Sequence, residues 1–156
     1  MAELNPAVIP LSLYIHMPWC VRKCPYCDFN SHAVPDGELS LELEQEYLHA
    51  LVEDFKTQVD FAQGRQIHTV FIGGGTPSLI SAQGYQWLFD QLQAIIPFAE
   101  GCEITLEANP GTVEHDPFAG YLQAGINRLS IGVQSFNTDH LKRLGRIHSN
   151  EDAISA

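Results

Sequence analysis

Residues 67–78 read IHTVFIGGGTPS, and this stretch decides the fold. Ile67–Ile72 is a mostly apolar, β-branched run of the length expected for a buried strand. The glycines and the proline of residues 73–77 end that strand abruptly. Ser81 then offers an N-cap for a helix whose apolar side chains form one stripe up to Pro97. The stretch therefore predicts a strand, a glycine-rich loop and a helix in succession.

The same unit recurs before and after this stretch. The predicted strands cover residues 11–16, 67–72, 102–107 and 126–134, and the predicted helices cover residues 40–63, 81–96, 117–125 and 137–144. Asp116 is expected to cap the third of these helices. Strands that alternate with helices predict an α/β fold with a parallel sheet, of which about four units are present.

The C-terminal residues begin a further unit that they do not complete. Ser149 or Asn150 would cap a new helix, but the sequence stops at Ala156. A parallel sheet is normally covered on both faces, and a bare edge invites association. We therefore expect this chain to be the N-terminal part of a longer protein.

The composition limits the classes of function. The chain has 156 residues, 45% of them hydrophobic and 17% charged, which is typical of one globular domain. No secretion signal opens the sequence and no apolar run has the length of a membrane span, so we expect a cytoplasmic protein. The net charge of −11 argues against a nucleic-acid partner, because phosphates attract basic proteins.

Three of the four cysteines stand close together in the loop after the first predicted strand. Cys20, Cys24 and Cys27 follow a C-x3-C-x2-C spacing, whereas Cys102 belongs to a later strand and is interpreted as a small buried apolar residue. Such crowding indicates a metal site in a reducing compartment, and thiolates favour zinc, Cu(I) or an iron–sulfur cluster.

The spacing separates these possibilities. A structural zinc site takes four protein ligands, and no fourth ligand is evident. A redox pair made of Cys24 and Cys27 would leave Cys20 without a role. An iron–sulfur cluster usually takes four thiolates, so three of them imply one iron that is open to another ligand.

Four further blocks, together with the cysteine spacing, resemble a known family. They are YIHMPWC from Tyr14, GGGTPS from Gly73, EANPG from Glu107 and RLSIGVQSF from Arg128. The chain resembles the radical S-adenosylmethionine (SAM) superfamily from about Leu11 to His148, in its oxygen-independent coproporphyrinogen III oxidase-like branch.

The resemblance implies an incomplete parallel (β/α)6 barrel of the TIM type. Residues 1–10 would be an N-terminal extension, and residues 11–156 the N-terminal part of a radical SAM core domain that is truncated at its C-terminal end. It further implies that Cys20, Cys24 and Cys27 ligate a [4Fe-4S] cluster, whose fourth iron takes the amino and carboxylate groups of SAM.

The resemblance also implies a set of SAM contacts. These residues are Tyr14, Tyr26, Gly74, Gly75, Thr76, Glu107, Gln134 and Arg146. The residues themselves allow plainer interpretations: the glycines can form a tight turn, Glu107 can be a solvated carboxylate at a strand end, and Arg146 an ordinary surface side chain. Tyr14 could likewise belong to the core and Tyr26 to loop packing.

Other residues near the cysteines carry weaker expectations. Arg22 and Lys23 are expected to be solvated loop charges, and His16 resembles the strand histidine of the family. The remaining histidines are expected to lie mostly at the surface without a ligand role: His32, His49, His68, His115, His140 and His148.

Two functions fit the branch, and one position separates them. The resemblance places a fourth cysteine of the true dehydrogenase where this chain has Phe29. It therefore favours a haem chaperone, which binds haem and a SAM-ligated cluster and passes haem to an acceptor protein. The alternative is a dehydrogenase that decarboxylates coproporphyrinogen III to protoporphyrinogen IX, so enzymatic activity stays open. A zinc-stabilised α/β domain is a third interpretation. The haem contacts are expected outside this chain, and neither the acceptor nor the electron donor is identified.

Overall fold

The computed structural model describes residues 5–34, 37–110 and 116–156. Residues 1–4 of the predicted N-terminal extension, Gly111 of the EANPG block and His115 lie outside the described residues. The elements are η1 (Pro6–Val8), β1 (Leu11–Met17), β2 (Trp19–Cys20), β3 (His32–Ala33), α1 (Leu41–Thr57), α2 (Val59–Ala62), β4 (Ile67–Gly74), η3 (Pro77–Leu79), α3 (Ala82–Ile95), β5 (Phe98–Ala108), α4 (Phe118–Gln123), β6 (Arg128–Ile131), α5 (Thr138–Arg143) and α6 (Asn150–Ser155). Among the described helices, none is long and apolar enough to cross a lipid bilayer.

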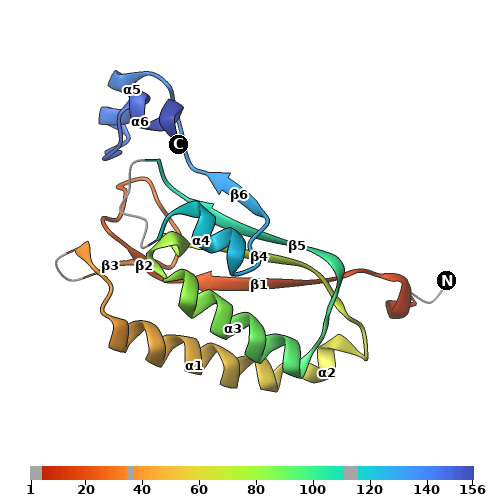
Figure 1. Cartoon of the computed structure of the whole chain (residues 1–156). Helices are drawn as coiled ribbons and strands as arrows, with labels where there is room; N and C mark the ends of the chain where they lie inside the picture. The colour runs from red at the N-terminus through yellow and green to blue at the C-terminus, as the bar shows by residue number, and fades with distance from the viewer. Residues whose placement is uncertain (1–4, 35–36, 111–115) are drawn as a thin grey trace.

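The strands form one four-stranded sheet in the order β1-β4-β5-β6, and every neighbouring pair is parallel (Figure 1). This confirms the α/β class and the parallel sheet. Each connection from one strand to the next carries a helix, as parallel neighbours require. The strands therefore point the same way, and their carboxyl ends meet at one edge of the sheet.

α1, α3 and α4 cover one face of this sheet, with α1 and α3 side by side, whereas α5 and α6 lie apart from it beyond β6 (Figure 1). Alternate strand residues point into that layer. The core joins Ile15, Val70, Ile72, Ile104 and Leu106 of the sheet to Leu48, Val52, Phe55, Tyr85, Leu88, Phe89 and Leu92 of the helices. Tyr14 and Phe71, which lie between these positions, are exposed and stack with ring centroids 6.3 Å apart. The opposite face thus carries an aromatic pair that spans β1 and β4.

Some predicted boundaries were wrong. The helix expected over residues 40–63 is broken after Thr57 into α1 and the short α2, and Gln63 adopts a positive φ of 52°. β6 ends at Ile131 rather than at Gln134, because the chain turns there and Gln134 itself has a φ of 64°. β2 and β3 were not predicted at all, since this two-residue pair depends on contacts across the cysteine loop.

The start of α3 depends on two carboxylates from elsewhere in the chain. Ser81 caps the helix as predicted, accepting from the backbone N–H of Gly84 at 2.9 Å. Glu44 of α1, only 3% exposed, accepts from the N–H of Ser81 at 2.9 Å and from its hydroxyl at 2.5 Å. Asp116 accepts from the N–H of Ala82 at 2.7 Å, so it serves α3 and does not cap α4 as predicted.

The Glu44 contact leaves no room for a side chain at Gly84. A Cβ there would lie 2.5 Å from Oε1 of Glu44 and 3.0 Å from Cδ1 of Leu48. Alanine normally stabilises a helix over glycine by about 1 kcal/mol. Overpacking costs roughly 1–3 kcal/mol, so we expect Gly84→Ala to lower the free energy of unfolding by up to about 2 kcal/mol.

Urea denaturation of the complete protein measures this loss. The matched control is Gly84→Ala in a Glu44→Ala background, where the clashing oxygen is gone and the second substitution should cost little. An equal loss in both backgrounds would contradict the packing described.

Candidate functional site

The carboxyl ends of the parallel strands surround a cavity of about 270 Å³. Ligands of parallel sheets generally bind at this edge. The cavity lies among the cysteine loop after β1, the glycine turn after β4 and the segments that follow β5 and β6. Its lining includes Cys20, Cys24, Tyr26, Cys27, Phe29, Gly74, Gly75, Thr76, Glu107, Asn109, Gln134 and Arg146. Every predicted site residue except Tyr14 therefore lines one cavity.

The glycine turn after β4 holds the beginning of the cysteine loop. The N–H of Gly75 donates to the carbonyl of Met17, and the N–H of Thr76 donates to the carbonyl of Trp19, both at 2.6 Å. A Cβ at Gly75 would lie 2.3 Å from the carbonyl oxygen of Trp19. Gly74 has a φ of 111°, where side chains are strained. The glycines are thus needed for this close approach.

The segment after the third cysteine is held by two side chains. The ammonium of Lys23 donates to the carbonyls of Phe29 at 3.0 Å and Ser31 at 3.2 Å. Nε2 of His16 lies 2.8 Å from the carbonyl of Asn30 between them. Three consecutive carbonyls therefore each meet a donor. Lys23 is exposed, as expected of a solvated loop charge, and its ammonium is in addition bonded to the backbone of the loop.

His16 connects this segment to β1. Because a carbonyl only accepts, Nε2 of His16 carries the proton toward Asn30, and Nδ1 is left to accept from the hydroxyl of Tyr14 at 3.0 Å. Tyr14 thus lies one side chain away from the cysteine loop but outside the cavity lining. Its predicted contact with SAM stays a prediction.

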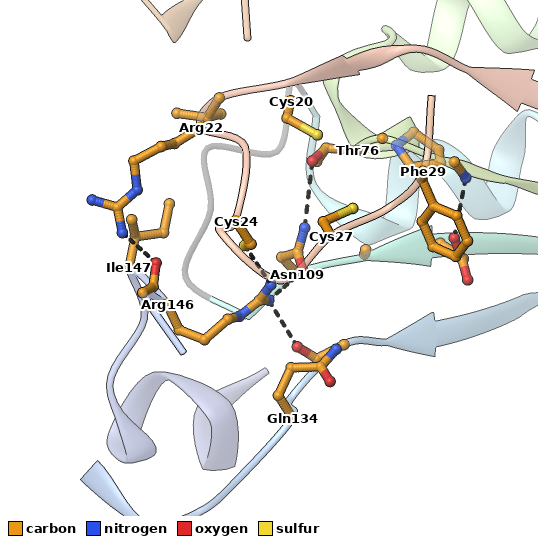
Figure 2. Close-up of a pocket in the computed structure, with 18 of the residues that line it drawn as sticks. Cys20, Arg22, Cys24, Cys27, Phe29, Thr76, Asn109, Gln134, Arg146 and Ile147 are labelled. Carbon is orange, nitrogen blue, oxygen red and sulfur yellow. Dashed lines mark hydrogen bonds between the residues drawn. The ribbon is translucent and has the colours of Figure 1, made fainter. Parts of the chain in front are cut away.

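Arg146 makes four hydrogen bonds within the site. Its Nη1 donates to Sγ of Cys24 at 3.5 Å and to the hydroxyl of Tyr26 at 3.4 Å. Its Nη2 donates to the carbonyl of Gly132 at 2.9 Å and to Oδ1 of Asn109. Figure 2 shows the guanidinium beside Cys24 and Asn109, and its Nε is buried without a hydrogen-bond partner in the described part of the chain. Arg146 is therefore not an ordinary surface side chain.

A second arginine ties the cysteine loop to the same segment. Arg22 is exposed, as expected of a solvated loop charge, and it also donates to the carbonyl of Gly145. His148, expected at the surface, is 4% exposed, and its Nε2 lies 3.0 Å from the carbonyl of Val133. Burial lowers the pKa of His148, which favours the neutral ring that donates to this carbonyl. The segment after α5 is thus anchored at two points.

Two tyrosine hydroxyls and the carboxylate of Glu107 are polar groups in or beside the site. Burial raises the pKa of Tyr26, although the neighbouring Arg146 opposes this shift. Burial, and secondarily the carboxylate of Glu107, also raise the pKa of Tyr14. Both phenols are therefore protonated donors at neutral pH. Oε2 of Glu107 accepts from the N–H of Gly74 at 3.3 Å, which places the carboxylate beside the glycine turn.

The radical SAM family model matches residues 14–156, almost the whole chain. The chain belongs to the radical SAM superfamily. This confirms the resemblance inferred from the motifs. The superfamily implies a [4Fe-4S] cluster and SAM as the ligands of the cavity.

Similar proteins support the same assignment. Heme chaperone HemW of Escherichia coli (strain K12) is 58% identical over 147 residues, covering 94% of this chain and 38% of the relative. Heme chaperone HemW of Haemophilus influenzae is 54% identical over 155 residues, covering 97% of this chain and 39% of the relative. The chain thus spans about two fifths of the length of these curated relatives.

A solved structure is similar in fold. It is that of coproporphyrinogen III oxidase (HemN) from Escherichia coli, described as a radical SAM enzyme. The TM-score is 0.79 at 29% identity, covering 94% of this chain and 33% of that one. The expected partial barrel of the radical SAM type is consistent with this agreement.

The cavity contains the kind of ligand that an iron–sulfur cluster takes. All four cysteines are free thiols, and Cys20, Cys24 and Cys27 line the cavity. Clusters of this type are held by cysteine thiolates, so this set of donors fits the [4Fe-4S] cluster that the radical SAM family implies. Cys102 does not line the cavity.

Sequence analysis missed two parts of the site. Asn109 entered the prediction only as part of the EANPG block, yet its Nδ2 lies 3.4 Å from the hydroxyl of Thr76 and its Oδ1 accepts from Arg146. The carbonyl of Gly132 is a further acceptor for Arg146. A polar residue directly after a parallel strand was the available signal for Asn109. No sequence signal indicates which carbonyl an arginine will reach.

The Lys23 contacts predict how firmly the loop is held. Lys23→Met keeps the length of the side chain but removes the ammonium that bridges Phe29 and Ser31. Losing such a bond at an exposed site costs about 1 kcal/mol, so amides of residues 27–34 should exchange roughly fivefold faster. Hydrogen–deuterium exchange of the complete protein measures this rate.

A lysine on α1 provides the matched control. Lys56 pairs with Glu53 one helical turn away, at 2.6 Å on an exposed helix face, so Lys56→Met should leave exchange in residues 27–34 unchanged. If Lys23→Met also leaves it unchanged, Lys23 does not hold the loop.

Proposed function

We propose that this chain is part of a haem chaperone that carries a [4Fe-4S] cluster and SAM, binds haem and transfers it to an acceptor protein. The observation that carries the proposal is one cavity lined by three free thiols, the glycine turn, Glu107 and Arg146. Identities of 54% and 58% to proteins named heme chaperone HemW support the function within the superfamily.

The cysteine thiolates would hold the cluster. Cys20 is buried at the start of the loop, and Cys24 and Cys27 are half-buried further along it. The N–H of Cys27 donates to the carbonyl of Cys24 at 3.0 Å, which makes the loop turn between these two residues. Three thiolates leave one iron for another ligand, which SAM would supply.

The remaining lining residues would hold SAM. The backbone of Gly74 to Thr76 can approach a ligand closely, and Glu107 offers a carboxylate for an ammonium or for ribose hydroxyls. The buried Nε of Arg146 is a donor that suits the SAM carboxylate. Gln134 adds an amide at the cavity wall. When bound, the cluster and SAM together supply one-electron chemistry.

Phe29 favours the chaperone over the dehydrogenase. It lines the cavity with a side chain that is 61% exposed, at the position where the dehydrogenase carries a fourth cysteine. A phenyl ring offers no thiolate. The likeness to coproporphyrinogen III oxidase keeps oxidative decarboxylation of coproporphyrinogen III as the second candidate.

The other parts of the proposal concern the whole protein. We place the haem contacts in the part of the protein outside this chain, together with the surface that meets the acceptor. Four free thiols suit a reducing compartment such as the cytoplasm. The acceptor and the electron donor are proteins to be found by experiment.

Two assays on the complete protein separate the two functions. With the chaperone, haemin titration should give a shifted Soret band, while coproporphyrinogen III incubated anaerobically with reductant and SAM should be recovered unchanged. Formation of protoporphyrinogen IX would overturn the chaperone in favour of the enzyme.

Phe29→Cys is an informative companion variant in these assays. It restores the thiol at the dehydrogenase position without altering the ligand cysteines. The account predicts the same haemin binding as the unaltered protein, because haem contacts lie elsewhere. Absence of any haemin binding by the unaltered protein would rule out haem delivery.

A further inference from the structure

We propose that Arg146 sets the reduction potential of the cluster by donating a hydrogen bond to the thiolate of Cys24, an inference that rests on the proposed function. Nη1 of Arg146 lies 3.5 Å from Sγ of Cys24, a usual separation for a nitrogen donor and a sulfur acceptor. Cys24 and Arg146 are 122 residues apart in the sequence, so this bond joins the cysteine loop to a distant segment of the chain.

The direction of the guanidinium is fixed from its other side. Nη2 donates to the carbonyl of Gly132 at 2.9 Å and to Oδ1 of Asn109. A guanidinium is planar, so anchoring one terminal nitrogen restricts where the other can point. Nη1 is thereby directed at Cys24 and Tyr26, and the bond to sulfur does not depend on a freely rotating side chain (Figure 2).

The bond to sulfur should favour the reduced cluster. Reduction by one electron adds one negative charge to the cluster and its thiolates. Hydrogen bonds to the sulfurs and nearby positive charge are among the factors that set iron–sulfur potentials, because they stabilise the more negative state. Arg146 is half-buried, where a charge acts more strongly than in bulk water. Arg146 therefore raises the potential.

The other cations of the loop point elsewhere. Arg22 donates to the carbonyl of Gly145, and Lys23 donates to the carbonyls of Phe29 and Ser31. These bonds hold the backbone, and their effect on the thiolates is indirect. Arg22 is therefore a matched control for Arg146: it is the same residue type, bridges the same two segments and is bonded to a carbonyl in place of a sulfur.

The test measures the midpoint potential of the reconstituted cluster in the complete protein, by EPR at poised potentials. SAM is left out, so that a change in SAM binding cannot produce the shift. Arg146→Gln removes both the positive charge and the paired Nη1 and Nη2 donors, and the midpoint potential of this variant should be clearly more negative. Arg146→Lys keeps the charge but not the paired donors, and its potential should lie between those of Arg146→Gln and the unaltered protein. Arg22→Gln removes a charge but no bond to sulfur, so its potential should fall by clearly less than that of Arg146→Gln.

Iron and sulfide contents are measured first, because they distinguish a failure of the proposed function from a failure of the inference about Arg146. If the unaltered protein holds no [4Fe-4S] cluster, the proposed function itself fails. If it does and loaded Arg146→Gln keeps the same potential, or Arg22→Gln falls equally, the inference about Arg146 is overturned while the proposed function stands.

A second variant decides the matter if Arg146→Gln does not load its cluster. Asn109→Ala leaves Arg146 in place but removes one anchor of Nη2. The inference predicts a smaller shift in the same direction for this variant and for Arg146→Lys. An unchanged potential in both would overturn it.

Discussion

The structure of the site depends on the close approach of two backbones. The turn after β4 donates from Gly75 and Thr76 to the carbonyls of Met17 and Trp19, at 2.6 Å each. No Cβ fits at Gly75, so any side chain there would push the cysteine loop away from the sheet. Because β1 and β4 are parallel neighbours, this contact joins their two carboxyl ends directly. The three thiols face the cavity only while that contact holds.

The loop that bears the thiols has little regular structure of its own, and side chains from other segments compensate. Lys23 and His16 satisfy three successive carbonyls after the third cysteine, while Arg22 and Arg146 connect the loop to the segment after α5. Positive side chains therefore gather around three potential thiolates in a chain of net charge −11. The local positive charge around the thiols, and not the negative net charge of the chain, is what would favour binding of an anionic cluster here.

Periodicity and breakers predicted the parallel sheet and most of its strands, because buried strands, glycine turns and helix caps are local signals. The cysteine spacing and the family resemblance predicted ten of the twenty described residues that line the cavity. What was missed depends on contacts distant in sequence: the bonds of Arg22 and Arg146, the carboxylate of Asp116 on α3, and the β2–β3 pair. The helix break after Thr57 could not be predicted, because no glycine or proline stands there in the sequence.

The central claim is that Cys20, Cys24 and Cys27 together hold one [4Fe-4S] cluster, and metal analysis after anaerobic reconstitution of the complete protein tests it most directly. The account predicts about four irons and four sulfides per chain. Replacing any one of these cysteines by serine should abolish that content, whereas Cys102→Ser should retain it, since Cys102 lies outside the cavity. Stoichiometric zinc in place of iron and sulfide, or full iron content after loss of a loop cysteine, would contradict the account.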